Sequence, residues 1–214
     1  MDKKNLLNFI FIIVIGLLTI YIASLFYSSE FFTNFLNESQ NNLYIFLLVV
    51  LFLKFLAIVY PPLPGAVFTL SLIPLIGWPA AYLVDFLGAT LGAGVSYTLA
   101  QKYGYRIINK VFPPEIAKRI KKTNIRKDKQ IESMIVLRVL TGGTIIEAVN
   151  YAAPILNVRF DKFLIGTVIS HPIFGIPVFF TAGTILTGGN ILYGVPLLIL
   201  LLLVLYKFRG RYLE

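Results

Sequence analysis

The chain has 214 residues, of which 57% are hydrophobic and 14% are charged, and it carries a formal net charge of +9. This composition excludes an ordinary soluble domain, and apolar runs of about 20 residues match the bilayer core, so we expect an integral membrane protein with one membrane domain. The absence of cysteine excludes disulfides, cysteine-ligated metals and thiol chemistry.

The basic residues are arranged as membrane topology requires and do not form a nucleic-acid surface. All but two of the 19 Lys and Arg residues fall into four clusters: Lys3 with Lys4, the segment 102–129, Arg159 with Lys162, and Lys207 with Arg209 and Arg211. By the positive-inside rule, these clusters and both termini lie in the cytoplasm, and the cation-free loops 27–42 and 187–190 lie outside. We therefore expect a multi-pass protein of the cell membrane, with no nucleic-acid partner.

The first apolar run, 6–26, predicts an anchor helix that crosses outward. It follows two lysines and could pass for a signal peptide, but the apolar region of a signal peptide reaches only about 15 residues. A polar external loop follows over 27–42. The predicted N-terminal unit, 1–42, is therefore an anchor helix with its loop.

The next apolar run, 43–76, is interrupted by the motif Tyr60-Pro61-Pro62-Leu63-Pro64-Gly65. Proline lacks the backbone N–H and clashes with the preceding helical turn, so the helix cannot continue through this motif. The stretch 66–76 is too short to cross a bilayer. A break that faced lipid would leave backbone groups unsatisfied at a cost of roughly several kcal/mol each. We therefore expect a re-entrant hairpin whose tip consists of Pro61, Pro62, Pro64 and Gly65.

A crossing helix is predicted over 80–100, after an outer turn at Gly77-Trp78-Pro79 where a tryptophan suits the interface. Asp85 lies one and two turns before Gly88 and Gly92, and this glycine row indicates close helix packing. The crossing helix ends at the first large basic cluster of the chain.

The basic segment 102–129 carries ten Lys and Arg residues and two acidic ones. Pro113-Pro114-Glu115 is typical of a helix start, and Ile116 and Ile120 then share one face. Two interpretations stay open, an amphipathic helix that lies on the inner leaflet and a solvated loop. In either case, anionic inner-leaflet lipids are the expected partners of this segment.

The second half of the chain repeats the arrangement of the first. A short apolar run, 131–140, ends at Thr141-Gly142-Gly143-Thr144, and the run 145–158 leads to the next basic cluster. This predicts a second re-entrant hairpin, entered from the cytoplasm, with Gly142 and Gly143 at its tip. A helix over 163–186 then crosses outward.

The C-terminal unit, 187–214, turns outside and returns through a last helix over 191–206 to a basic tail. The predicted fold is therefore an all-α membrane protein. Its central domain, 43–186, is expected to be an inverted repeat of a re-entrant hairpin plus a crossing helix, with the two tips meeting near the midplane.

Four ionisable residues lie within apolar sequence: Lys54, Asp85, Arg138 and Glu147. Each would cost about 2.5–3.5 kcal/mol at the bilayer centre, so pairing of the two cations with the two acids is expected. One interpretation is a polar cavity that binds a phosphate-bearing headgroup, with Arg138 as ligand and an acid as proton partner. The other is a set of buried ion pairs that fix the hairpins, with Lys54 reaching the interface by snorkelling. His171 is a fifth candidate, although a histidine before a proline equally suits helix packing.

Enzymatic function is not expected. The sequence has no HExxH, no GxSxG and no phosphate-binding loop, and it has one histidine. We therefore expect no metal and no other cofactor.

Two stretches of the chain carry a pattern shared by a known family. The second hairpin reads Arg138-Val-Leu-Thr-Gly-Gly-Thr-Ile-Ile-Glu147-Ala-Val-Asn150-Tyr-Ala-Ala-Pro154, and the first half has Pro61-Pro62-Leu63-Pro64-Gly65 and Gly88-x-x-x-Gly92. Over roughly residues 50–185 this resembles the VTT domain of the DedA superfamily. The likeness is closer to the branch with the eukaryotic endoplasmic-reticulum scramblases than to bacterial DedA proteins.

The resemblance implies two facing re-entrant hairpins and the movement of lipids between leaflets. It places Arg138, Asn150 and Pro154 at the family's arginine, asparagine and proline. The chain departs from bacterial members at Ala93, where an acid is common, and at Thr141 and Thr144, which replace a proline and an arginine. These departures favour energy-independent scrambling over proton-coupled transport of a lipid carrier.

Three functions remain open from the sequence. The first is a scramblase or flippase of phospholipid or polyprenyl-phosphate lipid, with Arg138, Glu147, Asn150, Asp85 and Lys54 as lipid-binding residues. The second is a small-solute transporter coupled to protons or ions, and the third is a membrane assembly protein. An oligomer is compatible with each of the three.

Overall fold

The computed structural model describes residues 42–63, 65–140 and 146–188, together with Glu30 and Asn34. Within these ranges the secondary structure is helical and contains no strand. The helices predicted over 6–26 and 191–206, and the tip residues Pro64, Gly142 and Gly143, lie outside the described residues.

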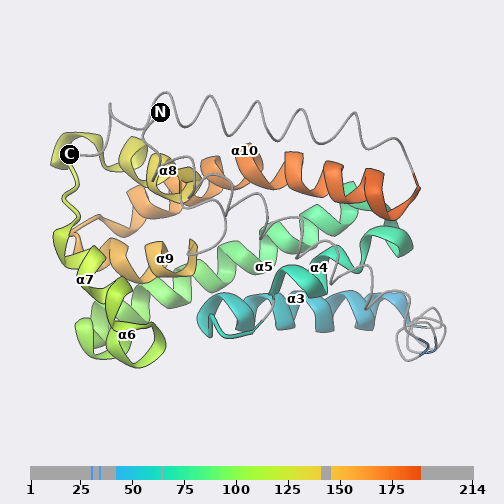
Figure 1. Cartoon of the computed structure of the whole chain (residues 1–214), viewed down its shortest axis with the longest axis horizontal. Helices are drawn as coiled ribbons and strands as arrows, with labels where there is room; N and C mark the ends of the chain where they lie inside the picture. Colours follow the sequence, from blue (N-terminus) through green and yellow to red (C-terminus); the bar gives the residue numbers. More distant parts are fainter. Residues whose placement is uncertain (1–29, 31–33, 35–41, 64, 141–145, 189–214) are drawn as a thin grey trace.

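Two long helices, α5 (Ile73–Tyr103) and α10 (Phe160–Leu186), pack against each other and run side by side along the long axis of the molecule (Figure 1). Both are long and apolar enough to cross a membrane. The crossing helices predicted over 80–100 and 163–186 are therefore confirmed as helices. Each begins several residues earlier than the sequence predicted.

The proline motif breaks the first apolar run as expected. Helix α3 (Leu43–Val59) ends immediately before it, and α4 (Gly65–Leu70) begins after it. The two helices touch, because a Cβ on Gly65 would lie only 2.6 Å from the Cβ of Ala57. The break therefore returns the chain against the helix that precedes it.

The prediction of a single helical leg over 66–76 is wrong. Helix α4 stops at Leu70, and α5 starts at Ile73. The Ser71 hydroxyl donates to the Phe68 carbonyl at 2.8 Å. Pro74, three residues later, has no backbone N–H to extend the hydrogen bonds of α4. Proline instead favours the first turn of a new helix, which is its place in α5.

The predicted outer turn at Gly77-Trp78-Pro79 is a bend inside α5. Gly77 has φ 78° and ψ 157°, a left-handed conformation that glycine adopts without steric cost. The helix resumes through Pro79. Residues 73–76 therefore continue into the long helix after a local change of direction.

The basic segment contains helices α6 (Tyr105–Val111) and α7 (Pro114–Lys122) and a short 3-10 turn, η1 (Lys127–Lys129), at one end of the molecule (Figure 1). The predicted start of α7 is confirmed. Its apolar residues Ala117 and Ile120 are buried in a cluster with Ile108, Phe112 and Tyr151. The apolar face of α7 is thus covered by the protein itself, so the interpretation of a helix inserted in the inner leaflet is wrong for that face.

The second broken region consists of α8 (Gln130–Leu140) and α9 (Ile146–Ile155). Helix α8 packs on α10, and α9 packs on α5, just as α3 packs on α5 in the first half. Glycines make these approaches close. A Cβ on Gly88 or Gly92 would lie within 3.0 Å of α3 atoms, and one on Gly166 would lie 2.8 Å from the Met134 Cβ on α8.

Candidate functional site

Asp85 on α5 is the meeting point of four helices. Its Oδ1 lies 2.6 Å from the Lys54 Nζ of α3 and accepts a hydrogen bond of 2.7 Å from the Thr69 hydroxyl of α4. Its Oδ2 lies 3.2 Å from the His171 Nε2 of α10. All four side chains are buried, so the carboxylate exchanges its water for three polar partners.

Local packing explains why Lys54 points inward. Its stem passes directly over Gly88, where an added Cβ would lie 2.8 Å from the Lys54 Cγ. The missing side chain at Gly88 therefore makes room for the lysine to reach Asp85. Lys54 is buried and paired, so the interpretation that it snorkels to the interface is wrong. The rings of Tyr82 and Phe86 pack against the imidazole of His171, with ring centroids 5.7 and 5.3 Å from its own.

Arg138 on α8 forms a second buried polar cluster. Its Nη1–H donates to the Asn150 Oδ1 of α9, and its Nε–H donates to the Ser170 hydroxyl of α10 at 3.0 Å. Ser170 in turn donates to the Thr167 carbonyl at 3.1 Å. Among the described residues, the Asn150 Nδ2 and the Thr167 hydroxyl are buried without a hydrogen-bond partner. The cluster therefore contains two hydrogen-bonding groups, the Asn150 Nδ2 and the Thr167 hydroxyl, that its own members do not satisfy.

Glu147 connects the two clusters. It lies in the first turn of α9 and interacts electrostatically with Lys54, Arg138 and Asp85. We call these four residues, together with His171, the charged centre. The two cations and two acids predicted to pair are thus brought together, and the close contact is between Lys54 and Asp85.

The sequence matches one family over most of the described region. A sequence profile of the VTT domain matches residues 61–185, which is more than half of the chain. The chain belongs to the VTT-domain family, also called the DedA family. No curated protein sequence matches the chain, and no solved structure matches it. The narrower placement near the eukaryotic scramblase branch stays a prediction.

Membership makes this chain a membrane protein of the DedA family, which accounts for the two long apolar helices, α5 and α10. The residues that the resemblance placed at the family's arginine and asparagine, Arg138 and Asn150, are bonded to each other. The family positions thus lie at the centre of the fold.

Of the other candidate residues, Gly65 packs against Lys54 of the charged centre, where an added Cβ would lie 3.4 Å from the Lys54 Cδ. Pro61 and Pro62 lie in the break after α3, where Pro62 is exposed. Pro154, inside α9, lines a separate cavity. In the described ranges no group of three or more His, Cys, Asp or Glu side chains is arranged to hold a metal ion.

Sequence reasoning missed the hydroxyl partners in both clusters. Thr69 binds Asp85, and Ser170 binds Arg138. Single hydroxyls are common in membrane helices, where they bond their own backbone. For Ser170, the sequence offered one indication of a buried position. It directly precedes His171, which was already a candidate residue in the same helix.

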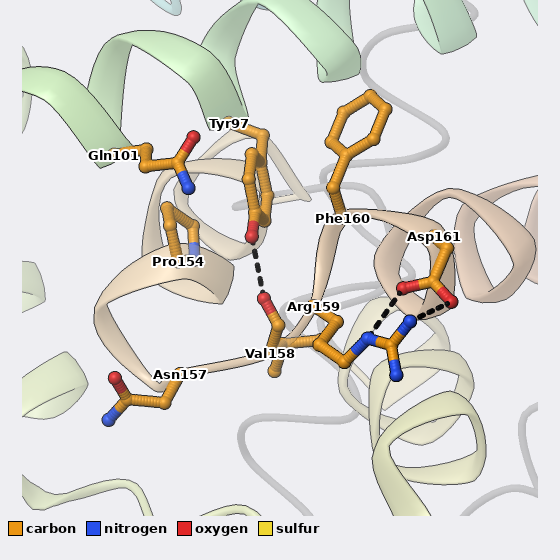
Figure 2. Close-up of a pocket in the computed structure, with 8 residues that line it drawn as sticks. All are labelled: Tyr97, Gln101, Pro154, Asn157, Val158, Arg159, Phe160 and Asp161. Carbon is orange, nitrogen blue, oxygen red and sulfur yellow. Dashed lines mark hydrogen bonds and ion pairs between the residues drawn. The ribbon is translucent and has the colours of Figure 1, made fainter.

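A cavity of about 400 Å³ lies where α5 meets the connection from α9 to α10 (Figure 2). Its lining contains aromatic, amide and charged side chains: Tyr97, Gln101, Pro154, Asn157, Val158, Arg159, Phe160 and Asp161. The Tyr97 hydroxyl donates to the Val158 carbonyl at 2.7 Å, and Arg159 binds Asp161. None of the residues of the charged centre lines this cavity.

Proposed function

We propose that this protein moves phospholipid or polyprenyl-phosphate lipid between membrane leaflets, along a polar path where two re-entrant hairpins face each other. The observation that carries the proposal is the charged centre, which lies between α3–α4 and α8–α9 inside the membrane domain. Buried charges in membrane segments are costly and line substrate or ion pathways in many transporters.

Arg138 is the group we propose to contact the lipid phosphate. A guanidinium presents its N–H groups in a fixed fork that matches phosphate oxygens. Two of its bonds are made with the neutral acceptors Asn150 and Ser170, and Glu147 interacts with it electrostatically. A phosphate could replace the two neutral acceptors, whereas a phosphate at Lys54 would have to displace the Asp85 carboxylate.

Both polar clusters are shielded in the structure, so lipid passage requires the hairpins to separate. Such a separation would move α3 with α4 and α8 with α9. The family departures at Ala93, Thr141 and Thr144 favour movement down a concentration difference, without an energy source.

A second candidate is a proton- or ion-coupled transporter of a small solute, and His171 favours it. Chains of Asp, Glu and His side chains form proton relays in many pumps and transporters, and the His171 Nε2 faces the Asp85 carboxylate from within the membrane domain. This function would require a gradient, and the lipid function would not.

Leaflet exchange in vesicles tests the proposal. The purified protein is reconstituted with fluorescent lipids of several headgroups, and reduction of outer-leaflet label is followed with and without a pH gradient. We expect exchange without a gradient. Arg138→Ala and Glu147→Ala should each slow exchange about tenfold or more. The first variant loses the charged hydrogen bond to the lipid phosphate, and the second loses the negative charge of Glu147 that balances Arg138.

The matched control is Lys118→Gln, which removes an exposed charge on α7. If both variants remain folded and exchange lipid at the full rate, the site assignment is wrong. Exchange that depends wholly on the gradient would favour the second candidate, and wild-type protein that moves no lipid under either condition would refute the lipid function.

A further inference from the structure

The cavity beside Tyr97 has the dimensions of a ligand site. Its volume of about 400 Å³ falls within the roughly 300–1,000 Å³ of typical small-molecule pockets. It is formed by three segments, the C-terminal part of α5, the end of α9, and the start of α10 (Figure 2). The charged centre uses none of these side chains.

Specific bonds hold the wall of the cavity in place. Tyr97 binds the Val158 carbonyl, and the Arg159 backbone N–H donates to the Gln130 Oε1 at 3.1 Å. Asn157 has φ 57°, a left-handed conformation that asparagine tolerates better than most residues. The connection from α9 to α10 is therefore fixed before any ligand binds.

The cavity presents both signs of charge side by side. The Arg159 guanidinium binds Asp161 through Nε and Nη2, each at 3.1 Å, and the two side chains are 72% and 48% exposed. An anion alone would meet the carboxylate, and a cation alone would meet the guanidinium. A ligand with neighbouring positive and negative groups satisfies both residues at once.

Aromatic rings supply a second feature of the lining. The Tyr97 ring is buried between Phe160 and Phe163, with ring centroids 5.2 and 5.0 Å away. The Phe160 ring is 45% exposed, so it is the ring that a ligand can reach. An aromatic ring attracts ammonium groups through the negative potential of its face.

The position along α5 and α10 indicates the depth of a lipid headgroup. Ile165 and Val168 follow Asp161 on the same face of α10 and are exposed. On α5, exposed Leu87 lies on the face that carries Gln101. The exposed surface thus changes from apolar to polar at the cavity, as it does between the acyl chains and the headgroups of a bilayer.

We propose that this cavity binds the headgroup of a zwitterionic phospholipid. Arg159 contacts the phosphate, and Asp161 with the exposed ring of Phe160 contacts the ammonium. The acyl chains lie along the exposed apolar faces of α5 and α10. This site is distinct from the charged centre, and it holds lipid whether or not the protein exchanges lipid between leaflets.

The chain contains a built-in comparison for the charge pair. Arg126 and Asp128 have the same spacing and a similar pairing at 3.0 Å, but they lie outside this cavity. If a surface Arg–Asp pair were enough to bind the headgroup, both pairs would act alike. The structure instead assigns binding to Arg159, because of the two pairs only Arg159 and Asp161 line the cavity, beside the exposed Phe160 ring.

Binding is measured on the full-length protein in detergent with four short-chain probes: dihexanoyl phosphatidylethanolamine, dihexanoyl phosphatidylglycerol, dihexanoylglycerol and glycerophosphoethanolamine. We expect the first to bind tightest. Arg159→Gln and Asp161→Asn should each weaken its binding about tenfold, the value of one charged hydrogen bond, whereas Arg126→Gln should leave it unchanged.

Three outcomes would overturn the proposal. The first is equal binding of phosphatidylethanolamine and dihexanoylglycerol, and the second is equal loss in Arg159→Gln and Arg126→Gln. The third is equal binding of glycerophosphoethanolamine, which would assign a soluble ligand instead of a lipid. A protein that binds the headgroup but exchanges no lipid would refute only the proposed transport.

Discussion

Each half of the membrane domain has a buried cation at a similar position, but the two cations have chemically different partners. Lys54 on α3 and Arg138 on α8 each lie on the helix that precedes a break, and each reaches the long helix that follows, α5 or α10. In the first half, the partner on the long helix α5 is a carboxylate, that of Asp85. In the second half, the partner on α10 is a hydroxyl, that of Ser170.

This difference separates a locked cluster from an exchangeable one. A buried lysine–aspartate pair is held by the cost of leaving either charge alone. A guanidinium can exchange a neutral amide or hydroxyl acceptor for phosphate oxygens. Under the proposed function, the pair in the first half therefore stabilises the fold, and Arg138 in the second half binds the lipid phosphate.

Removing the carboxylate of the first half should give the largest loss of stability. Asp85→Asn leaves the Lys54 charge buried without its counter-ion, which costs about 3–5 kcal/mol in comparable pairs. Lys54→Met combined with Asp85→Asn should recover most of this loss. Thermal denaturation of the detergent-solubilised protein measures both.

The second half supplies the control for this prediction. Ser170→Ala removes a neutral partner of Arg138 and should lower the unfolding temperature by less than Asp85→Asn does. An equal loss in the two variants, or no recovery in the double variant, would show that the halves do not differ as described.

Charge within apolar sequence was enough to predict much of this centre. Lys54, Asp85, Arg138 and Glu147 stand out because lipid penalises them, and their convergence followed from the breaks in the chain. Their partners did not stand out. A hydroxyl such as that of Thr69 costs little in an apolar helix, so its position gives no signal until the fold brings it to Asp85.

The errors in the fold have the same origin. The helix break at Ser71 lies in an apolar stretch, and hydropathy does not report a hydroxyl that bonds its own backbone. The apolar face of α7 was visible in the sequence, but its cover was not. Tyr151, from α9, supplies part of that cover from a distant part of the chain.

Glycine packing should give the next largest effect. A Cβ on Gly92 would lie 2.6 Å from the Ile58 Cβ and 2.9 Å from the Phe55 carbonyl oxygen, so Gly92→Ala should cost about 1–3 kcal/mol through overpacking. In the second half, Gly166→Ala should cost less, because the nearest backbone atom is 3.3 Å away. Denaturation midpoints compare the two.

Gly94→Ala is the matched control on the same helix. Its nearest neighbour would be the Phe160 ring at 3.9 Å, an ordinary contact, so its stability should match that of the wild type or slightly exceed it. A loss in Gly94→Ala as large as that in Gly92→Ala would trace the effect to helix α5 in general and not to the contact with α3.

The smallest predicted effect concerns one of the hydrogen bonds between the two halves. The Tyr151 hydroxyl on α9 donates to the carbonyl of Val59, the last residue of α3, at 2.6 Å. Tyr151→Phe keeps the buried ring against Phe112 and removes this bond together with the interaction between the hydroxyl and Ser96. The loss of the bond should cost about 0.5–1.5 kcal/mol. Amide hydrogen exchange should rise at the end of α3 while α10 remains protected.

The neighbouring variant Tyr60→Phe separates this bond from a general effect on the break. Tyr60 follows Val59 and is 55% exposed, so loss of its hydroxyl should leave exchange at the end of α3 unchanged. If Tyr151→Phe also leaves it unchanged, this bond does not hold the end of α3 against α9. If exchange rises in both helices, the bond stabilises the whole domain, and the two halves do not move as separate units.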